Sequence, residues 1–132
     1  MIDRQTLRAY CASRKGAVED YPFGPDTLVF KVMGKIFALM PVNPPPVDGP
    51  IGSEPGAIPL RINLKCDPKL AQILRETYPS VRPGYHMNKR HWNTVIIDGT
   101  ISDDEIFEMI DNSYMLVVSG LKKADRDRLN VL

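Results

Sequence analysis

Two alternating segments joined by a short turn constrain the fold of this chain more than any other feature. In Thr27–Val32 and Lys35–Met40, apolar side chains alternate with others, as they do in strands that bury one face. Met33-Gly34 between them has the length and the glycine of a two-residue hairpin turn. Such a turn is expected to pair the following residues across the strands and to bury all four on one face: Phe30 with Phe37, and Leu28 with Leu39.

Further strands and helices follow from similar patterns. Strands are expected over Leu60–Lys65 and Trp92–Ile97. Helices are predicted from about Asp3 to Ser13, from Asp67-Pro68 to Tyr78, and from Ser102 through Leu121, where Ser102 and Glu105 form a capping box. The tail from Lys122 either continues the last helix or frays. The buried stripe of the second helix is expected to consist of Leu70, Ile73 and Leu74.

The order of these elements predicts an α+β fold. Antiparallel strands are grouped between helices at both ends of the chain, so a two-layer sandwich is expected in which an antiparallel sheet packs against helices. The helices are expected to cover one face and to leave the other partly exposed. At 132 residues, the chain fits a single domain spanning 1–132. The proline-rich and glycine-rich stretch Pro41–Pro59 is predicted to be a long surface loop.

Composition and cysteine spacing indicate a soluble, intracellular protein. Hydrophobic residues make up 43% of the chain and charged residues 25%, with no apolar run of membrane-spanning length, so no membrane partner is expected. Met1–Thr6 has no apolar signal-peptide core, which favours a cytoplasmic location. Cys11 and Cys66 lack a second cysteine at metal or redox spacing and are expected to be reduced, buried thiols without a catalytic role.

The segment Arg82–Thr94 has the chemistry of a recognition surface, because it combines basic, aromatic and amide side chains without one acid. Cations can contact phosphates, amides can contact base edges, and aromatic rings can stack on unpaired bases. Polar residues of two strands join this segment if they point away from the helices. The candidate nucleic-acid-binding residues are therefore Lys31, Arg61, Asn63, Lys65, Arg82, Tyr85, His86, Asn88, Lys89, Arg90, His91, Trp92 and Asn93.

The same residues also fit a purely structural interpretation. Pro83-Gly84 is a natural turn, lone histidines such as His86 and His91 are more often structural, and Trp92 is more often a core anchor than a stacking platform. A net charge of only +1 weakens the case for nucleic-acid binding. The acids that crowd Asp103–Asp111 are simply favourable near the start of a helix.

No metal site and no enzymatic activity are predicted. His86 and His91 are five residues apart, which is not the helical spacing of paired ligands, and no carboxylate lies nearby in the sequence. No nucleophile, base and orienting group are recognisable as a set. The sequence therefore predicts no cofactor.

Four segments give the chain a resemblance to a known family: Pro22–Pro25 followed by Phe30–Val32, Leu64–Pro68, Pro83–Thr94, and Asp111–Tyr114. They run through nearly the whole chain in order, and the third is long and uncommon. On these residues the chain resembles the MmcQ/YjbR family. The resemblance implies a fold similar to CyaY and frataxin, also compared with the "double wing" DNA-binding domain of a phage transcription factor. It implies DNA binding through that likeness of fold alone.

The chain departs from the family pattern mainly in Pro41–Pro59, which is expected either to cross the open sheet face or to border a site there. The likeness to frataxin suggests iron, but the first helix carries Arg4, Arg8, Arg14 and Lys15 where an acidic ridge would be needed. Iron handling is therefore not expected.

Two hypotheses about function remain open at this point. The first is a non-catalytic, monomeric DNA-binding or other nucleic-acid-binding protein that uses a basic and aromatic sheet face. The second is a module that binds an acidic protein or a small anion and has no role with nucleic acid. Nucleic-acid affinity should rise with polymer length, whereas a compact anion pocket should saturate with a small ligand.

Overall fold

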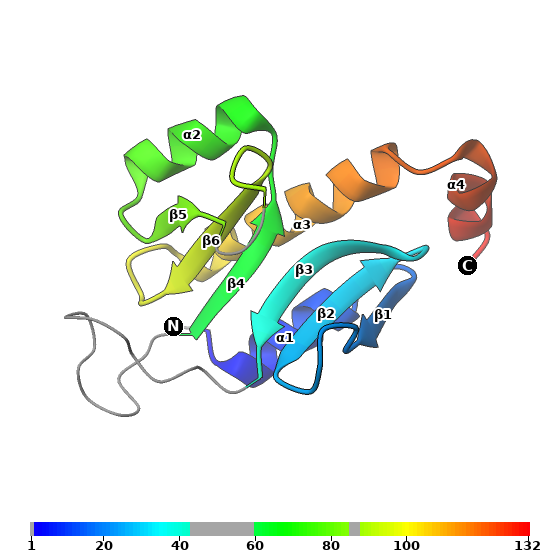
Figure 1. Cartoon of the computed structure of the whole chain (residues 1–132), viewed down its shortest axis with the longest axis horizontal. Coiled ribbons are helices and arrows are strands. Elements are labelled where there is room, and N and C mark those ends of the chain that lie inside the picture. Colours follow the sequence, from blue (N-terminus) through cyan, green and yellow to red (C-terminus); the bar gives the residue numbers. More distant parts are fainter. Residues whose placement is uncertain (1, 43–59, 85–87) are drawn as a thin grey trace.

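A six-stranded antiparallel sheet with strand order β1-β2-β3-β4-β6-β5 forms the centre of the structure (Figure 1). The computed structural model describes residues 2–42, 60–84 and 88–132. The strands are β1 (Ala17–Asp20), β2 (Thr27–Val32), β3 (Lys35–Pro41), β4 (Leu60–Lys65), β5 (Val81–Pro83) and β6 (Trp92–Ile97). The helices are α1 (Arg4–Ala12), α2 (Pro68–Thr77), α3 (Asp103–Ser119) and α4 (Lys123–Asn130). The predicted α+β fold is confirmed.

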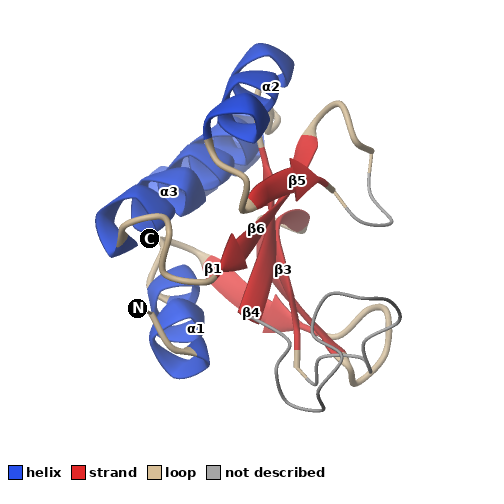
Figure 2. Ribbon diagram, turned by 90° about the vertical axis from the view of Figure 1, so that its left-hand side faces the viewer, coloured by secondary structure: helices blue, strands red, loops and turns tan. Residues whose placement is uncertain are grey.

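Helices α1, α2 and α3 lie on the same side of the sheet, and within the described ranges no helix covers the other side (Figure 2). The hydrophobic core fills the space between these two layers. Its largest fully buried side chains are Phe30, Phe37, Leu7, Met40, Ile62, Ile106 and Ile110. The predicted arrangement, in which helices cover one face and leave the other partly exposed, is confirmed: on the second face Arg82 is exposed, whereas Val29, Leu39 and Thr94 are buried. We call the uncovered side the open face.

The predicted helix starts are confirmed by their caps. The Asp3 carboxylate accepts a hydrogen bond from the Thr6 amide at 2.7 Å, and the Asp67 carboxylate accepts from two amides of α2. Pro68 at the first position of α2 has no N–H that would need a partner. The Ser102 hydroxyl accepts from the Glu105 amide at 3.3 Å, and so fixes the start of α3.

The hairpin between β2 and β3 has the predicted turn but a different register. Met33 and Gly34 have φ angles of 49° and 81°, the positive values that a two-residue hairpin turn of this kind needs. Beyond the turn, a β-bulge skips Phe37, so that Phe30 lies opposite Ala38 rather than opposite Phe37. The predicted pairs Phe30–Phe37 and Leu28–Leu39 are therefore wrong. Met40 takes the place of Leu39 opposite Leu28 and joins the core.

Helix α2 buries a different side from the one predicted. Ala71 is its buried residue and Leu74 is half-buried, whereas Ile73 is 55% exposed and Leu70 is also exposed. The predicted stripe is correct only at Leu74. Helical spacing predicts which side of a helix is apolar. Which side packs on the sheet also depends on the side chains of the sheet, and here the buried Asn93 amide donates to the Ala71 carbonyl of α2.

Strands β3 and β4 are joined by a side chain as well as by backbone pairs. Their paired residues are Ala38 with Leu64 and Leu39 with Asn63. Next to these pairs, the fully buried Ser113 hydroxyl of α3 accepts from the Lys65 amide at 2.9 Å and donates to the Phe37 carbonyl. One hydroxyl thus satisfies a backbone donor of β4 and a backbone acceptor of the bulged β3.

Neighbours of Ser113 in α3 tie this helix to α1. The Asp111 carboxylate accepts from Tyr10 Oη at 2.7 Å and from Arg14 Nη1 at 3.0 Å. The Tyr10 ring stacks on Phe107 with a centroid distance of 4.1 Å. Tyr114 packs edge-on against Phe37 at 5.4 Å and donates its hydroxyl to the Lys15 carbonyl. The motif Asp111–Tyr114 therefore holds α1, α3 and the sheet together.

Three elements were not predicted or were left open. Strands β1 and β5 are the two short edges of the sheet and did not stand out by alternation. The tail forms a separate helix, α4, whose Leu129 is buried. The predicted loop Pro41–Pro59 lies largely outside the described residues. None of the described helices is long and apolar enough to span a membrane.

We predict that Ser113→Ala destabilises the protein by about 2 kcal/mol, because it leaves the Lys65 N–H and the Phe37 carbonyl buried without their partner. Chemical denaturation measures this change. The matched control is Ser119→Ala, whose exposed hydroxyl donates only to the Leu116 carbonyl of its own helix. Equal stability of the two variants would show that Ser113 does not join the strands.

Candidate functional site

Strand β4 presents its polar side chains on the open face. Ile62 and Leu64 are buried in the core, and side chains alternate along a strand. Arg61, Asn63 and Lys65 therefore point away from the helices, as predicted for this strand. All three are half-buried rather than fully exposed.

Strand β6 adds an aromatic ring to the same face. The register places Trp92 opposite Lys65 and Thr94 opposite Asn63. The Thr94 hydroxyl donates to the Asn63 side-chain oxygen, which confirms that these two side chains share a face. On the other edge of β6, Arg82 of β5 also lies opposite Thr94. We call Arg61, Lys65, Arg82 and Trp92 the basic sheet face.

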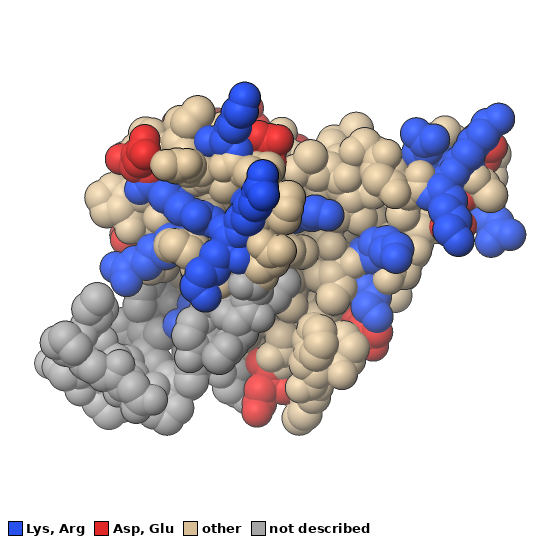
Figure 3. Space-filling model, turned by 45° about the horizontal axis from the view of Figure 1, so that its top comes forward, with Lys and Arg blue, Asp and Glu red and all other residues tan. Residues whose placement is uncertain are grey.

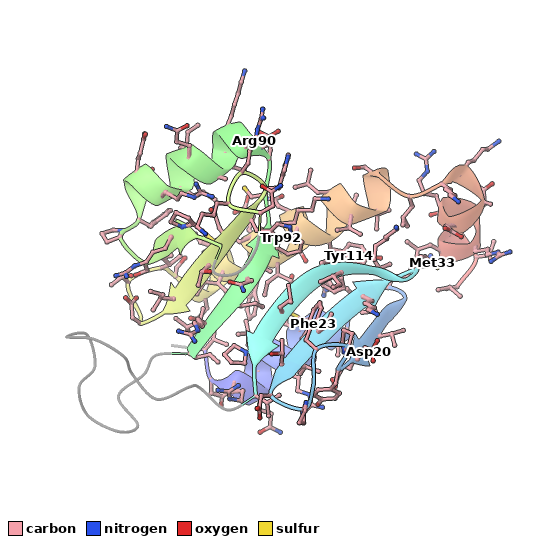
Figure 4. The ribbon with its side chains drawn as sticks, in the orientation of Figure 1. Asp20, Phe23, Met33, Arg90, Trp92 and Tyr114 are labelled. Carbon is pink, nitrogen blue, oxygen red and sulfur yellow. The ribbon has the colours of Figure 1, made fainter. Side chains whose placement is uncertain are left out.

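A turn at the start of β6 adds two more cations. The Asn88 side chain accepts from the Arg90 amide at 3.0 Å, and its carbonyl accepts from the His91 and Trp92 amides at 3.2 and 3.0 Å. This local hydrogen bonding leaves the Lys89 and Arg90 side chains exposed. We call this segment, 88–91, the basic turn. Figure 4 shows Arg90 near the start of α2 and Trp92 at strands β4 and β6.

The cations of the basic sheet face and basic turn differ in pairing from those of α1. Within the described residues, no carboxylate lies within ion-pair distance of Arg61, Lys65, Arg82, Lys89 or Arg90. By contrast, Arg8 and Arg14 of the α1 region pair with Glu19 and Asp111. Figure 3 shows Lys and Arg side chains gathered over the part of the molecule that carries α2, β4, β5 and β6, with a second group over α4.

Arg75 of α2 holds the basic turn in place. Its Nε donates to the Asn93 side-chain oxygen at 2.7 Å, and its Nη2 donates to the Trp92 carbonyl at 3.1 Å and to the Lys89 carbonyl. The guanidinium thus links the helix to the turn and to β6 through three acceptors. The sequence analysis did not identify Arg75. A lone arginine in the last turn of a helix carries no signal of such distant partners.

Asn93 lies on the side of β6 that faces the helices. It is 2% exposed, accepts from Arg75 and donates to the Ala71 carbonyl at 3.5 Å. The Asn93 side-chain amide is therefore hydrogen-bonded inside the protein, whereas the neighbouring Trp92 side chain lies on the open face. The prediction that Asn93 contacts a ligand does not agree with this position, because alternation along a strand sends adjacent residues to opposite faces.

Several other predicted site residues do not belong to the basic sheet face. Lys31 is on the open face but pairs with Asp20 at 2.9 Å, and β3 separates its strand from β4. His91 is half-buried and its carbonyl accepts from the Cys66 amide at 2.7 Å. Asn88 is exposed, and its side-chain oxygen accepts from the Arg90 amide within the basic turn. Tyr85 and His86 lie outside the described residues.

The described residues contain no cluster of three or more potential metal-ligating side chains. A small cavity of about 20 Å³ lies between α2, α3 and the covered side of the sheet, lined mainly by apolar groups including Leu70, Leu74 and Met109. That volume is close to the space one water molecule needs. The cavity is therefore too small for a cofactor.

Both cysteines are free and buried, as predicted. Burial raises the pKa of the Cys11 thiol to about 12, and it also raises the pKa of Cys66. We predict that neither thiol reacts readily with iodoacetamide near pH 8 in the native protein, because the thiolate is the reactive form. Labelling followed by mass spectrometry, with the denatured chain as control, measures this. Native labelling of Cys11 as fast as in denaturant would contradict the prediction.

We predict that Arg75→Met destabilises the protein by about 1–3 kcal/mol and speeds amide hydrogen exchange in the basic turn, because Asn93 and two carbonyls lose a donor. Methionine keeps much of the apolar stem. Arg90→Met is the matched control, since the Arg90 side chain is exposed. Unchanged exchange in Arg75→Met would show that Arg75 does not hold the turn.

Comparison with known proteins identifies relatives over most of the chain. A sequence model of the YjbR family matches residues 12–116. Protein YbdF of Escherichia coli O157:H7 is 42% identical over 109 residues, which cover 83% of this chain and 79% of YbdF. Protein YjbR of Escherichia coli strain K12 is 31% identical over 123 residues, which cover 93% of each chain. Both relatives are described as uncharacterized.

Solved structures show the same fold. The crystal structure of Deinococcus radiodurans protein DR2400, with a domain named DUF419, has a TM-score of 0.78 and 36% identity, and the match covers 96% of this chain and 86% of that one. A crystal structure of a Pseudomonas syringae protein has a TM-score of 0.72 and 33% identity, with coverage of 87% and 98%.

Proposed function

The chain belongs to the YjbR family, and from that premise we propose that it is a non-catalytic nucleic-acid-binding protein that uses the basic sheet face and the basic turn. The proposal extends to a monomeric protein in the cytoplasm, where the two free thiols remain reduced. Family membership supplies the fold, and the proposed ligand rests on the side chains of this chain.

The observation that carries the proposal is a set of five cations beside one tryptophan, with no carboxylate partner among the described residues. Cations that have no internal partner keep their full attraction for an external anion. Arg61 and Lys65 are four residues apart on β4, which separates them by about 13 Å. Spacing of this kind suits a polymer with repeated phosphates better than one small anion.

The distribution of acids supports the same orientation. Asp103, Asp104 and Glu105 occupy the first turn of α3, on the covered side of the sheet. A polyanion is therefore attracted to the open face and repelled from the side that carries α3. A net charge of +1 then still allows binding, because the local field and not the total charge guides the ligand.

The second hypothesis is that the ligand is an acidic protein or a small anion, and it involves the same cations. Trp92 favours nucleic acid between the two, because a base offers a planar partner for the indole ring that aspartate and glutamate side chains lack. Competition between labelled DNA and polyglutamate separates the two hypotheses. If polyglutamate displaces the DNA when both are present at the same concentration of negative charges, the result would favour an acidic protein as the ligand.

We predict that the triple variant Arg61→Gln, Lys65→Gln, Arg82→Gln binds DNA more weakly and with a salt slope smaller by about 2–3, because three cations that contact phosphates are lost. Fluorescence anisotropy of labelled duplex and single-stranded DNA over a salt series measures both quantities. The double variant Lys89→Ala, Arg90→Ala tests the basic turn in the same way.

The matched control changes the same number of charges elsewhere. Lys35, Lys123 and Arg126 are exposed and lie on β3 and α4, away from the basic sheet face. Replacing these three with Gln should leave the salt slope nearly unchanged. Equal losses in the test and control variants would contradict the proposed site, and no binding of any DNA by the wild-type protein at low salt would contradict the proposed function.

A further inference from the structure

We infer that the basic sheet face takes single-stranded nucleic acid in preference to a duplex, with Trp92 as the stacking platform for an unpaired base. This inference rests on the proposed function and narrows its ligand class. Two features of the structure carry it. One is the position of Trp92 on β6 between cations of the two flanking strands, β4 and β5, and the other is the width of the surface that these three strands form.

Trp92 is placed where a base and its phosphates can be bound together. It is half-buried, so one part of the indole is anchored and another part meets solvent. Lys65 lies directly opposite it across the β4–β6 ladder. Directly opposite residues have Cβ atoms about 5 Å apart. The Lys65 ammonium group can therefore contact the phosphate of a nucleotide whose base stacks on the Trp92 indole ring. Single-strand sites combine an aromatic platform with a cationic track in this way.

The cations around Trp92 lie on both sides of its strand. Arg82 belongs to β5 on one side of β6, and Arg61 and Lys65 belong to β4 on the other. The three strand axes span about 10 Å before any side chain is counted. The major groove of DNA is about 12 Å wide and admits a helix or a two-stranded ribbon. This three-stranded face with arginines at both margins is too broad to enter it.

Helices α1, α2 and α3 are less suited to reading a duplex than the basic sheet face is. Helix α3 begins with three acids, and the cations Arg8 and Arg14 near α1 are paired with carboxylates. The exposed side of α2 carries apolar Leu70 and Ile73. A duplex also hides its base faces in the stack, so Trp92 has nothing to stack on unless the strands separate. An unpaired strand exposes its base faces without the free-energy cost of separating two strands.

Trp92 is the single tryptophan of the chain, so its fluorescence reports directly on the inferred contact. Titration with oligothymidylate, oligouridylate and a duplex of equal nucleotide content is the experiment. We expect the single strands to quench the indole emission at lower concentration than the duplex does. The thymidylate and uridylate arms distinguish DNA from RNA as the source of the single strand.

Variants at Trp92 test the stacking role by anisotropy with labelled oligothymidylate. Trp92→Leu should weaken single-strand binding about tenfold or more, because base stacking on an aromatic ring is lost, while Trp92→Phe should retain much of the affinity. Phe23→Leu is the matched control, since Phe23 is an aromatic residue that is 65% exposed in the β1–β2 connection. Circular dichroism confirms that each variant is folded.

The outcomes separate this inference from the proposed function. Single-strand preference with a specific loss in Trp92→Leu supports the inference. Duplex binding that is equal or tighter, with no effect of Trp92→Leu and a loss in the triple cation variant, overturns the single-strand inference and leaves the proposed function intact. Absence of binding to every oligonucleotide overturns both. An equal loss in Trp92→Leu and Phe23→Leu overturns the assignment of the stacking platform.

Discussion

The buried hydroxyl of Ser113 is the contact on which the arrangement of the sheet depends. It lies where the bulged strand β3 meets β4, and it bonds one backbone group of each. The neighbouring positions in α3 bring α1 to the same helix through Asp111 and pack Tyr114 on Phe37. A single turn of one helix therefore sets the position of β4, and β4 carries two of the cations on the open face.

The residues that give the chain its family resemblance are largely structural. Asp67 caps α2, Ser113 joins two strands, and Asn88 organises the turn before β6. Arg75, which no motif singled out, bonds to that turn and to the buried Asn93. These four residues thus use their polar groups for contacts within the protein. The basic sheet face stands apart because its cations have no such partner among the described residues.

Few of the predicted site residues are both on the open face and without a carboxylate partner among the described residues. Of the predicted site, the structure brings together Arg61, Lys65, Arg82 and Trp92 on one face, with Lys89 and Arg90 at its end. It assigns Asn93 to the interior and pairs Lys31 with Asp20. A set of thirteen candidate residues from several segments is thereby reduced to a smaller surface with defined neighbours.

The sequence by itself determined the starts of α1, α2 and α3, the Met33-Gly34 turn, the polar face of β4 and the overall α+β class, because caps, turn residues and alternation act within a few neighbours. Only the tertiary structure decided the bulge at Phe37, the buried side of α2, the partners of Arg75 and the inward position of Asn93. Each of these depends on groups far apart in the chain that compete for the same buried space and hydrogen bonds, and no local pattern records the outcome of that competition.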